Sequence, residues 1–177
     1  YRPLEQQNGF VKFKLFVLSQ SIPLSEVLPL LENMGFKVMA ERGNEIKLKE
    51  DKTIWISEFS LTMPNAEAID VDAVKENFKE AFARTWRGDA ESDDFNALVI
   101  YAGLNWREAT LLRVYAKYFR QIGFRFSQAY IEETLLLYPH IAQLLVKLFH
   151  TLFDPNTDDA SNAEMLETDI LKAIDAV

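Results

Sequence analysis

Adjacent acidic residues are the first place to look for acid and base chemistry in this chain. There are three such pairs: Asp93 with Asp94, Glu132 with Glu133, and Asp158 with Asp159. Neighbouring residues of a helix point in different directions, so a pair of this kind does not converge on one substrate atom. Helix caps and solvated loops explain the pairs better, because carboxylates are favoured at the positive end of a helix dipole. We therefore predict no catalytic residue.

The residue types that hold metals, nucleotides or covalent intermediates are sparse. Phosphate-binding loops need closely spaced glycines, whereas the six glycines here stand alone, at positions 9, 35, 43, 88, 103 and 123. His140 and His150 form no zinc-binding pattern, and the chain has no cysteine. No serine, lysine or histidine has the spacing of a nucleophile and its base. We therefore predict neither a cofactor site nor a metal site within these residues.

One stretch is both basic and aromatic. Residues 105–125 hold one acid and five bases, in a chain of net charge −8: Arg107, Arg113, Lys117, Arg120 and Arg125. At about 100° per residue, three of the bases share a narrow stripe of a helix, and large apolar side chains fill most of the remaining arc. Burying such side chains outweighs a screened charge pair, so we expect a mostly buried helix. Its basic stripe would face acidic groups of the same helical array or of an adjoining domain, and an anion or nucleic-acid site is the alternative.

Composition narrows the class of protein. The net charge of −8 argues against nucleic-acid and membrane-surface partners, because both attract clustered bases. No apolar run approaches the roughly 20 residues of a membrane-spanning helix, and no signal peptide opens the chain. The lack of cysteine fits a reducing compartment. We expect a soluble, cytoplasmic protein. Because the chain begins at Tyr1 and its helical periodicity continues to Val177, we also expect a segment of a longer polypeptide.

The first half has the pattern of a small mixed sheet. Residues 10–18 alternate apolar and polar side chains as a half-buried strand does, and residues 24–34 repeat apolar side chains at helical spacing. Residues 36–62 form two alternating stretches around a polar turn, and Asp70 precedes an amphipathic helix. The order β-α-β-β-α predicts a ferredoxin-like unit without its last strand.

The second half is predicted to be helical throughout. Asn105 with Glu108 has the spacing of a capping box, Gly123 ends that helix, Ser127 starts the next one, and Pro139 interrupts it. Because a sheet of three strands needs more than one covering helix, we place the helix after Asp70 with the sheet. The predicted domains are residues 1–90 and residues 91–177.

Several strings resemble one family along essentially the whole chain and in collinear order. They are "LPLLENMGFKVMAER" (28–42), "WISEF" (55–59), "AFARTWRGDAESDDFN" (81–96), "AGLNWRE" (102–108), "LLRVYAKYFRQ" (111–121) and "FSQAYIE" (126–132). In these strings the chain is similar to the large bacterial NAD-specific glutamate dehydrogenases.

The resemblance implies a noncatalytic piece of such an enzyme. The parent would deaminate L-glutamate oxidatively to 2-oxoglutarate and ammonia with NAD, and NAD would bind elsewhere in the parent. The matching strings belong to the N-terminal region, which carries ACT-like modules and helical motifs. The expected fold is therefore α+β, an ACT-like module over residues 1–90 and a helical segment over residues 91–177. The expected partners are other domains of the same long chain, within a homo-oligomer.

The resemblance also names a candidate effector site. ACT modules commonly bind an amino acid where the first strand meets the first helix, which here is the loop of Ser19, Gln20 and Ser21. The loop lacks the usual glycine, and the last strand is missing, so a purely architectural role is at least as well supported. Two hypotheses remain: a regulatory and assembly segment that uses the five bases of residues 105–125 as an interdomain contact stripe, and an amino-acid-sensing module.

Overall fold

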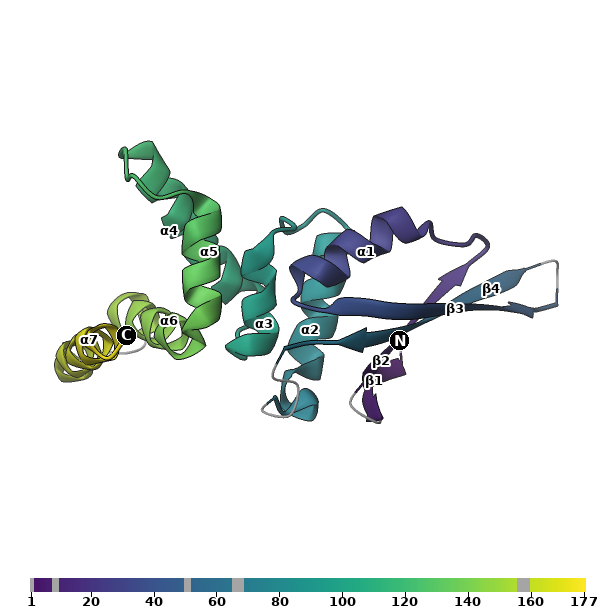
Figure 1. Ribbon diagram of the computed structural model, residues 1–177, viewed down its shortest axis with the longest axis horizontal. Coiled ribbons are helices and arrows are strands. Elements are labelled where there is room, and N and C mark those ends of the chain that lie inside the picture. Colours follow the sequence, from purple (N-terminus) through teal and green to yellow (C-terminus); the bar gives the residue numbers. More distant parts are fainter. Residues whose placement is uncertain (1, 8–9, 50–51, 65–68, 156–159) are drawn as a thin grey trace.

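The structure is a computed structural model that describes residues 2–7, 10–49, 52–64, 69–155 and 160–177 (Figure 1). Strands and two helices form one end of the elongated molecule, and the remaining helices extend from it to the other end. The predicted α+β class, with a sheet module followed by a helical segment, is confirmed.

The sheet has four antiparallel strands in the order β1-β2-β4-β3. Its strands are β1 (Arg2–Gln7), β2 (Phe10–Leu18), β3 (Lys37–Lys47) and β4 (Thr53–Thr62). The predicted strand at residues 10–18 and the predicted hairpin are both present. Phe13 faces Phe59 across the β2–β4 ladder, and Gly43 faces Ser57 across the β3–β4 ladder.

Strand β1 is the one element that the sequence pattern did not predict. Its residues, RPLEQQ, lack the alternation of apolar side chains that marks a half-buried strand. It pairs antiparallel with β2, at the sheet edge where the last strand of a ferredoxin-like unit would lie. An N-terminal hairpin thus fills the place of the strand expected to be missing.

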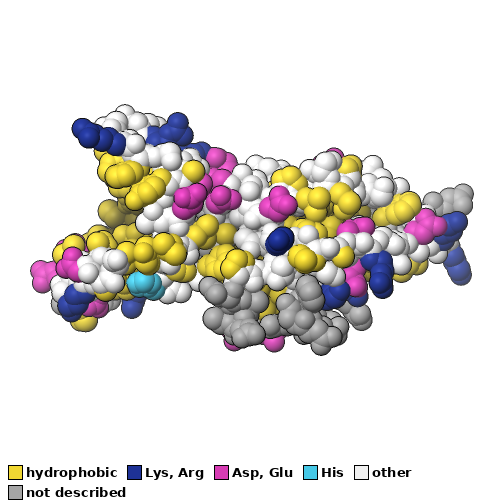
Figure 2. Space-filling view, viewed as in Figure 1, with side chains coloured by type: hydrophobic (Ala, Val, Ile, Leu, Met, Phe, Trp, Pro, Cys, Tyr) yellow, Lys and Arg dark blue, Asp and Glu magenta, His cyan; other side chains and the backbone are white. Residues whose placement is uncertain are grey.

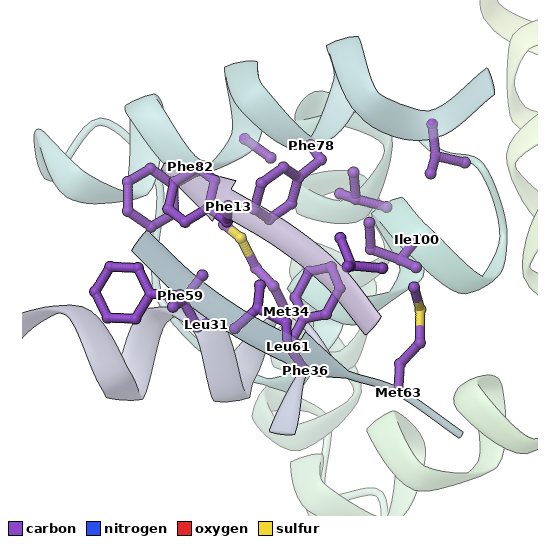
Figure 3. Close-up of a cluster of buried hydrophobic side chains, with 14 of the residues drawn as sticks. Phe13, Leu31, Met34, Phe36, Phe59, Leu61, Met63, Phe78, Phe82 and Ile100 are labelled. Atoms are coloured by element: carbon purple, nitrogen blue, oxygen red, sulfur yellow. The ribbon is translucent and has the colours of Figure 1, made fainter. Parts of the chain in front are cut away.

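Helices α1 (Leu24–Asn33) and α2 (Val71–Trp86) cover one face of the sheet. Asp70 caps α2 by accepting hydrogen bonds from the backbone amides of Asp72 and Ala73. Phe13 lies at the centre of the buried cluster, with the rings of Phe78 and Phe82 packed edge-on at 5.4 and 5.0 Å between centroids (Figure 3). These ring contacts fix α2 on the inner face and leave the opposite face of the sheet uncovered.

The helical segment follows without further strands among the described residues. It comprises a 3₁₀ turn η2 (Asp94–Ala97) and helices α3 (Leu98–Tyr101), α4 (Trp106–Gln121), α5 (Gln128–Leu137), α6 (Pro139–Phe153) and α7 (Ala160–Asp175). The capping box of Asn105 and Glu108 is confirmed at the start of α4. Ser127 caps α5, and Pro139 occupies the first turn of α6, as predicted.

The two halves share part of one core. Val99, Ile100 and Ala109 of the helical segment pack into the cluster beneath the sheet. Tyr101 donates a hydrogen bond to the carbonyl of Gly35, at 3.2 Å. Gly35 has a φ of +83°, and a Cβ atom there would lie 2.6 Å from the Tyr101 ring. The C-terminal end of α1 therefore packs directly against α3. The domain boundary near residue 90 stays a prediction.

Within the described residues, no single helix is both long enough and apolar enough to cross a membrane. Helices α5 and α6 satisfy that test only as a pair, and the chain bends by 103° between them.

Candidate functional site

The predicted effector loop borders a cavity of about 460 Å³. Gln20 and Ser21 line it together with Glu26 of α1 and the rings of Phe82 and Trp86. Ser19 is not among the lining residues. It adopts a φ of 77°, in the left-handed region that favours glycine, and its amide donates a hydrogen bond to the carbonyl of Thr53 at 2.8 Å. Ser19 thus occupies the glycine-like position in the connection.

The chemistry of this cavity suits a small ligand with a cationic end. Glu26 is the only charged group among its described lining residues, and it offers a carboxylate to an ammonium group. Gln20 and Ser21 supply neutral donors and acceptors, and the two rings supply an apolar wall. No lysine or arginine among these residues faces a ligand carboxylate. The site can select for an amine more readily than for an acid.

A larger groove of about 890 Å³ lies where the sheet module meets the helical segment. Its charged lining residues are Glu32, Lys37, Asp94 and Glu133, beside the ring of Tyr101. Desolvation raises the pKa of Asp94, with the charges of Asp93 and Glu133 adding to the effect. Burial also raises the pKa of Tyr101. No hydrogen bond joins Asp94 to Glu133 among the described residues, and the Glu133 charge contributes to the raised pKa of Asp94.

The most highly organised polar cluster surrounds Arg113. Its side chain is only 2% exposed, and its guanidinium donates two hydrogen bonds of 2.7 Å to the Asp93 carboxylate. It also donates to Asn96 Oδ1 at 2.6 Å and to Thr110 Oγ1 at 3.2 Å, and it lies over the Phe95 ring. A bidentate, buried pair of this kind is among the strongest polar contacts a protein can form.

Two of the predicted acidic pairs meet at this cluster. Gln128 donates to Asp93 at 3.2 Å and to Glu132 at 2.8 Å, and so joins the start of α5 to the start of η2. Burial raises the pKa of Glu132, while the hydrogen bond from Gln128 opposes the shift. Sequence reasoning treated these acids as caps and solvated groups. Asp93 instead joins α4 to α5 through Arg113 and Gln128, and Glu132 is a buried group bound by Gln128 of its own helix. Asp158 with Asp159 lies outside the described residues.

The five bases of residues 105–125 separate into two groups. Arg113 and Lys117 already bind carboxylates of the same segment, those of Asp93 and Glu91. Arg107 lies over the Trp106 ring, and its side chain is exposed, as are those of Arg120 and Arg125. An interdomain role for the stripe stays a prediction, and it now applies to the three exposed arginines.

The prediction that α4 is mostly buried is wrong. Its buried side chains are Ala109, Leu112, Arg113 and Ala116. Five large apolar side chains of α4 and its C-cap point outward and are between 38% and 60% exposed: Val114, Tyr115, Tyr118, Phe119 and Ile122. The arginine cluster occupies the inward face of α4, so most of the aromatic arc is exposed, although the ring of Tyr115 lies 6.3 Å from that of Phe149 on α6. Figure 2 shows exposed apolar side chains on the arm at upper left.

Metal chemistry finds no support in the described part of the chain. No group of three or more His, Cys, Asp or Glu side chains there could hold an ion. His150 lies 3.3 Å from Glu108, and the ring of His140 packs edge-on against Tyr138. The two histidines therefore have separate structural neighbours.

Comparison with known proteins identifies two consecutive matches. Residues 1–74 match the family model described as glutamate dehydrogenase, ACT3 domain, and residues 90–155 match glutamate dehydrogenase, helical motif 3. The chain is 41% identical over its whole length to the NAD-specific glutamate dehydrogenase of Halomonas elongata and 36% identical over its whole length to that of Pseudomonas aeruginosa. It is 38% identical over 89% of its length to the enzyme of that name from Mycobacterium tuberculosis. The chain spans only 10–11% of the length of these relatives.

Removing the Arg113 guanidinium should destabilise the helical segment strongly. Arg113→Met leaves Asp93 and Asn96 without their partner, and we expect a loss of about 3–5 kcal/mol in the free energy of unfolding, measured by urea denaturation. Lys117→Met is the matched control: it removes an exposed ion pair of the same helix and should cost under about 1 kcal/mol. Equal losses for the two variants would contradict the structural role assigned to Arg113.

Proposed function

Because the chain belongs to the glutamate dehydrogenase family, whose ACT3 domain and helical motif 3 it carries, we propose that it is a noncatalytic assembly and regulatory segment. The parent enzyme would oxidise L-glutamate to 2-oxoglutarate and ammonia with NAD. The catalytic residues and the NAD site would lie in other parts of that polypeptide. A cytoplasmic location and a homo-oligomeric parent are part of the same proposal.

Exposed apolar surface is the observation that carries this proposal. On the uncovered face of the sheet, Phe16 and Leu18 of β2 and Ile46 of β3 are each at least 39% exposed. Ile54 and Ile56 of β4 pair with these positions and join them into one patch. Contiguous apolar patches on a soluble protein commonly mark interaction sites. The sheet face and the exposed side of α4 are therefore the two surfaces proposed for docking.

The polar clusters of the chain support a structural role. The arginine cluster is buried and internally satisfied, and no buried side-chain nitrogen or oxygen among the described residues lacks a hydrogen-bond partner. Catalysis needs ionisable groups that converge on a space where substrate can sit. The carboxylates of the larger groove are not arranged as an acid beside a base. We therefore propose that this segment functions through contacts with other domains of the same polypeptide or with other subunits.

The shared core offers a physical route for regulation. The end of α1 meets Tyr101 of α3, and α3 packs in turn against α4 and α5. A partner that shifts the sheet module would therefore also displace the helices, because closely packed interfaces move as units. In this proposal the segment transmits a contact made on the sheet to a surface on the helical side.

Activity measurements test the noncatalytic assignment. The chain alone should give no glutamate-dependent NADH formation. A chimera in which it replaces the matching segment of the Halomonas elongata relative should retain NADH formation to within about tenfold. Turnover by the isolated chain would refute the assignment. In the chimera, replacing both Phe16 and Leu18 by serine should weaken oligomer assembly. Replacing both Glu45 and Lys47 by serine, at exposed positions on the other face of β3, should not.

A second candidate function rests on the cavity at the strand–helix loop. Its volume exceeds that of an amino acid, and Glu26 could receive the ammonium group while Gln20 and Ser21 bond the polar remainder. The alternative is an amino-acid-sensing module, in which ligand binding changes how α1 packs on the sheet.

Calorimetric titration with each of the twenty amino acids tests this alternative. If the cavity is an effector site, at least one amino acid should bind with a dissociation constant below about 1 mM. Glu26→Gln should weaken that binding at least about tenfold, because no other described residue of the lining carries a carboxylate. The control Glu41→Gln lies away from the cavity and should have no effect. The absence of binding up to millimolar concentrations would eliminate the sensing module.

A further inference from the structure

Glu132 of α5 is a buried acid whose negative charge is only partly compensated. The residue is 6% exposed. Its Oε1 accepts one hydrogen bond of 2.8 Å, from the neutral amide of Gln128. Buried carboxylates usually contact a cation or several donors, because an ionised group loses its hydration on burial. Among the described residues, Glu132 has a single neutral donor and no cation in hydrogen-bond contact.

The one buried base nearby is committed to other groups. Arg113 attracts the charge of Glu132, but it donates no described hydrogen bond to it. Its donors go to the side chains of Asp93, Asn96 and Thr110. The bidentate pair with Asp93 takes two of these bonds, so one buried guanidinium faces two carboxylates and neutralises the other one.

A single side chain holds both carboxylates. Gln128 Nε2 donates to Asp93 at 3.2 Å and to Glu132 at 2.8 Å, so both acids lie within hydrogen-bond distance of one nitrogen. An amide nitrogen carries two hydrogens, and both are used here. Like charges this close repel each other, more strongly in a buried site than in water. Ionisation of Glu132 therefore opposes the contact that Gln128 makes between α5 and the start of η2.

The other elements around α5 do not offset this repulsion. Helix α5 packs on η2, α3, α4 and α6 (Figure 1). The charged groups that act on Glu132 are Asp93, Asp94 and Arg113, with Glu133 acting on Asp94. Tyr101 of α3 is bonded to the end of α1, and Lys117 of α4 is paired with Glu91. The titratable groups of α6 are engaged elsewhere: His140 packs on Tyr138, and Lys147 and His150 line a separate cavity at the start of α4.

Solvent can deliver a proton to this acid or remove one. Glu132 Oε2 has no described hydrogen bond, and no fully buried side-chain oxygen of the described residues lacks one, so Oε2 touches solvent. Burial raises the pKa of Glu132, and the hydrogen bond from Gln128 opposes that shift, whereas the charges of Asp93 and Asp94 add to it. Desolvation also raises the pKa of Asp94, with Asp93 and Glu133 adding to the effect. Both acids thus hold a proton more readily in the packed state than in water.

We propose that Glu132 is a proton-controlled latch between α5 and η2. A protonated Glu132 keeps Oε1 as an acceptor for Gln128, and Gln128 can then tie Asp93 to α5 without a competing charge. An ionised Glu132 repels Asp93 and Asp94, and this repulsion loosens α5 from η2. The proton comes from solvent and returns to it through Oε2.

The latch also bears on the larger groove, because α5 forms one of its walls. Glu133, Leu136 and Leu137 of α5 line this groove together with Gly35 and Lys37 of the sheet module. Loosening α5 would therefore change the width of the groove. The latch acts through contacts within the chain, so it does not depend on the assembly role proposed above.

Hydrogen exchange of the α5 amides at different pH values tests the latch, once the rates are corrected for the intrinsic pH dependence of exchange. A group whose pKa is raised in the packed state contributes stability that is complete in acid and is lost as the pH rises through that pKa. The protection of residues 128–137 should therefore fall at least about threefold between about pH 5 and about pH 7.5. The amides of α2 provide the internal reference and should keep their protection.

Two variants separate the latch from general effects of acid. Glu132→Gln keeps the size of the side chain and an acceptor for Gln128 but cannot ionise. Its α5 protection should be independent of pH and at least as high as that of wild type in acid. The control Glu167→Gln removes an exposed acid of α7 and should keep the wild-type response. Circular dichroism establishes that each variant is folded.

Carbon-13 NMR of the carboxyl groups gives a direct reading of the same acid. The signal that disappears in Glu132→Gln should titrate above the usual range of a glutamate. Titration within that range would overturn the inference. So would α5 protection in wild type that does not fall as the pH rises, or a fall that persists in Glu132→Gln. None of these measurements uses activity or assembly, so failure of the latch is distinguishable from failure of the proposed function.

Discussion

The burial of the Arg113 guanidinium determines how the helical segment is arranged. A charged side chain that is 2% exposed must satisfy its donors internally, and it does so on Asp93, Asn96 and Thr110. These bonds fix the rotation of α4 about its own axis, because Arg113 can reach η2 only if its side of the helix faces inward. The aromatic arc of α4 then has to face solvent or a partner.

The same arrangement connects the helices to the sheet. Helix α3 follows η2 directly, and its Val99 and Ile100 complete the core around Phe13, Phe78 and Phe82 (Figure 3). The contact between Tyr101 and Gly35 leaves no room for a side chain at residue 35. The sheet module and the first part of the helical segment are therefore packed against each other through a common core.

Much of the fold followed from local patterns, whereas the surface of α4 did not. Alternation at residues 10–18 and capping residues such as Asp70, Asn105 and Ser127 predicted their elements, because these signals depend on a few adjacent side chains. Strand β1 carries no such signal and forms because β2 offers it an edge. The burial of α4 was predicted wrongly. Periodicity shows which residues share a face of a helix, but the face that packs inward here is set by the contacts of Arg113 with residues far away in the sequence. Gln20 and Ser21 do line a cavity. The spacing of residues in the sequence does not predict whether that cavity binds a ligand.

The central claim of this account is that the aromatic side of α4 is exposed. Because the chain contains no cysteine, single thiols can report directly which side of α4 faces solvent. The measurement is the maleimide labelling rate of Val114→Cys and of Ala116→Cys, each taken at low protein concentration to limit self-association. The account predicts that the thiol at 114 reacts at least about 100-fold faster than the thiol at 116. Equal protection of both thiols would show that the aromatic arc is buried within the chain, and would contradict the account.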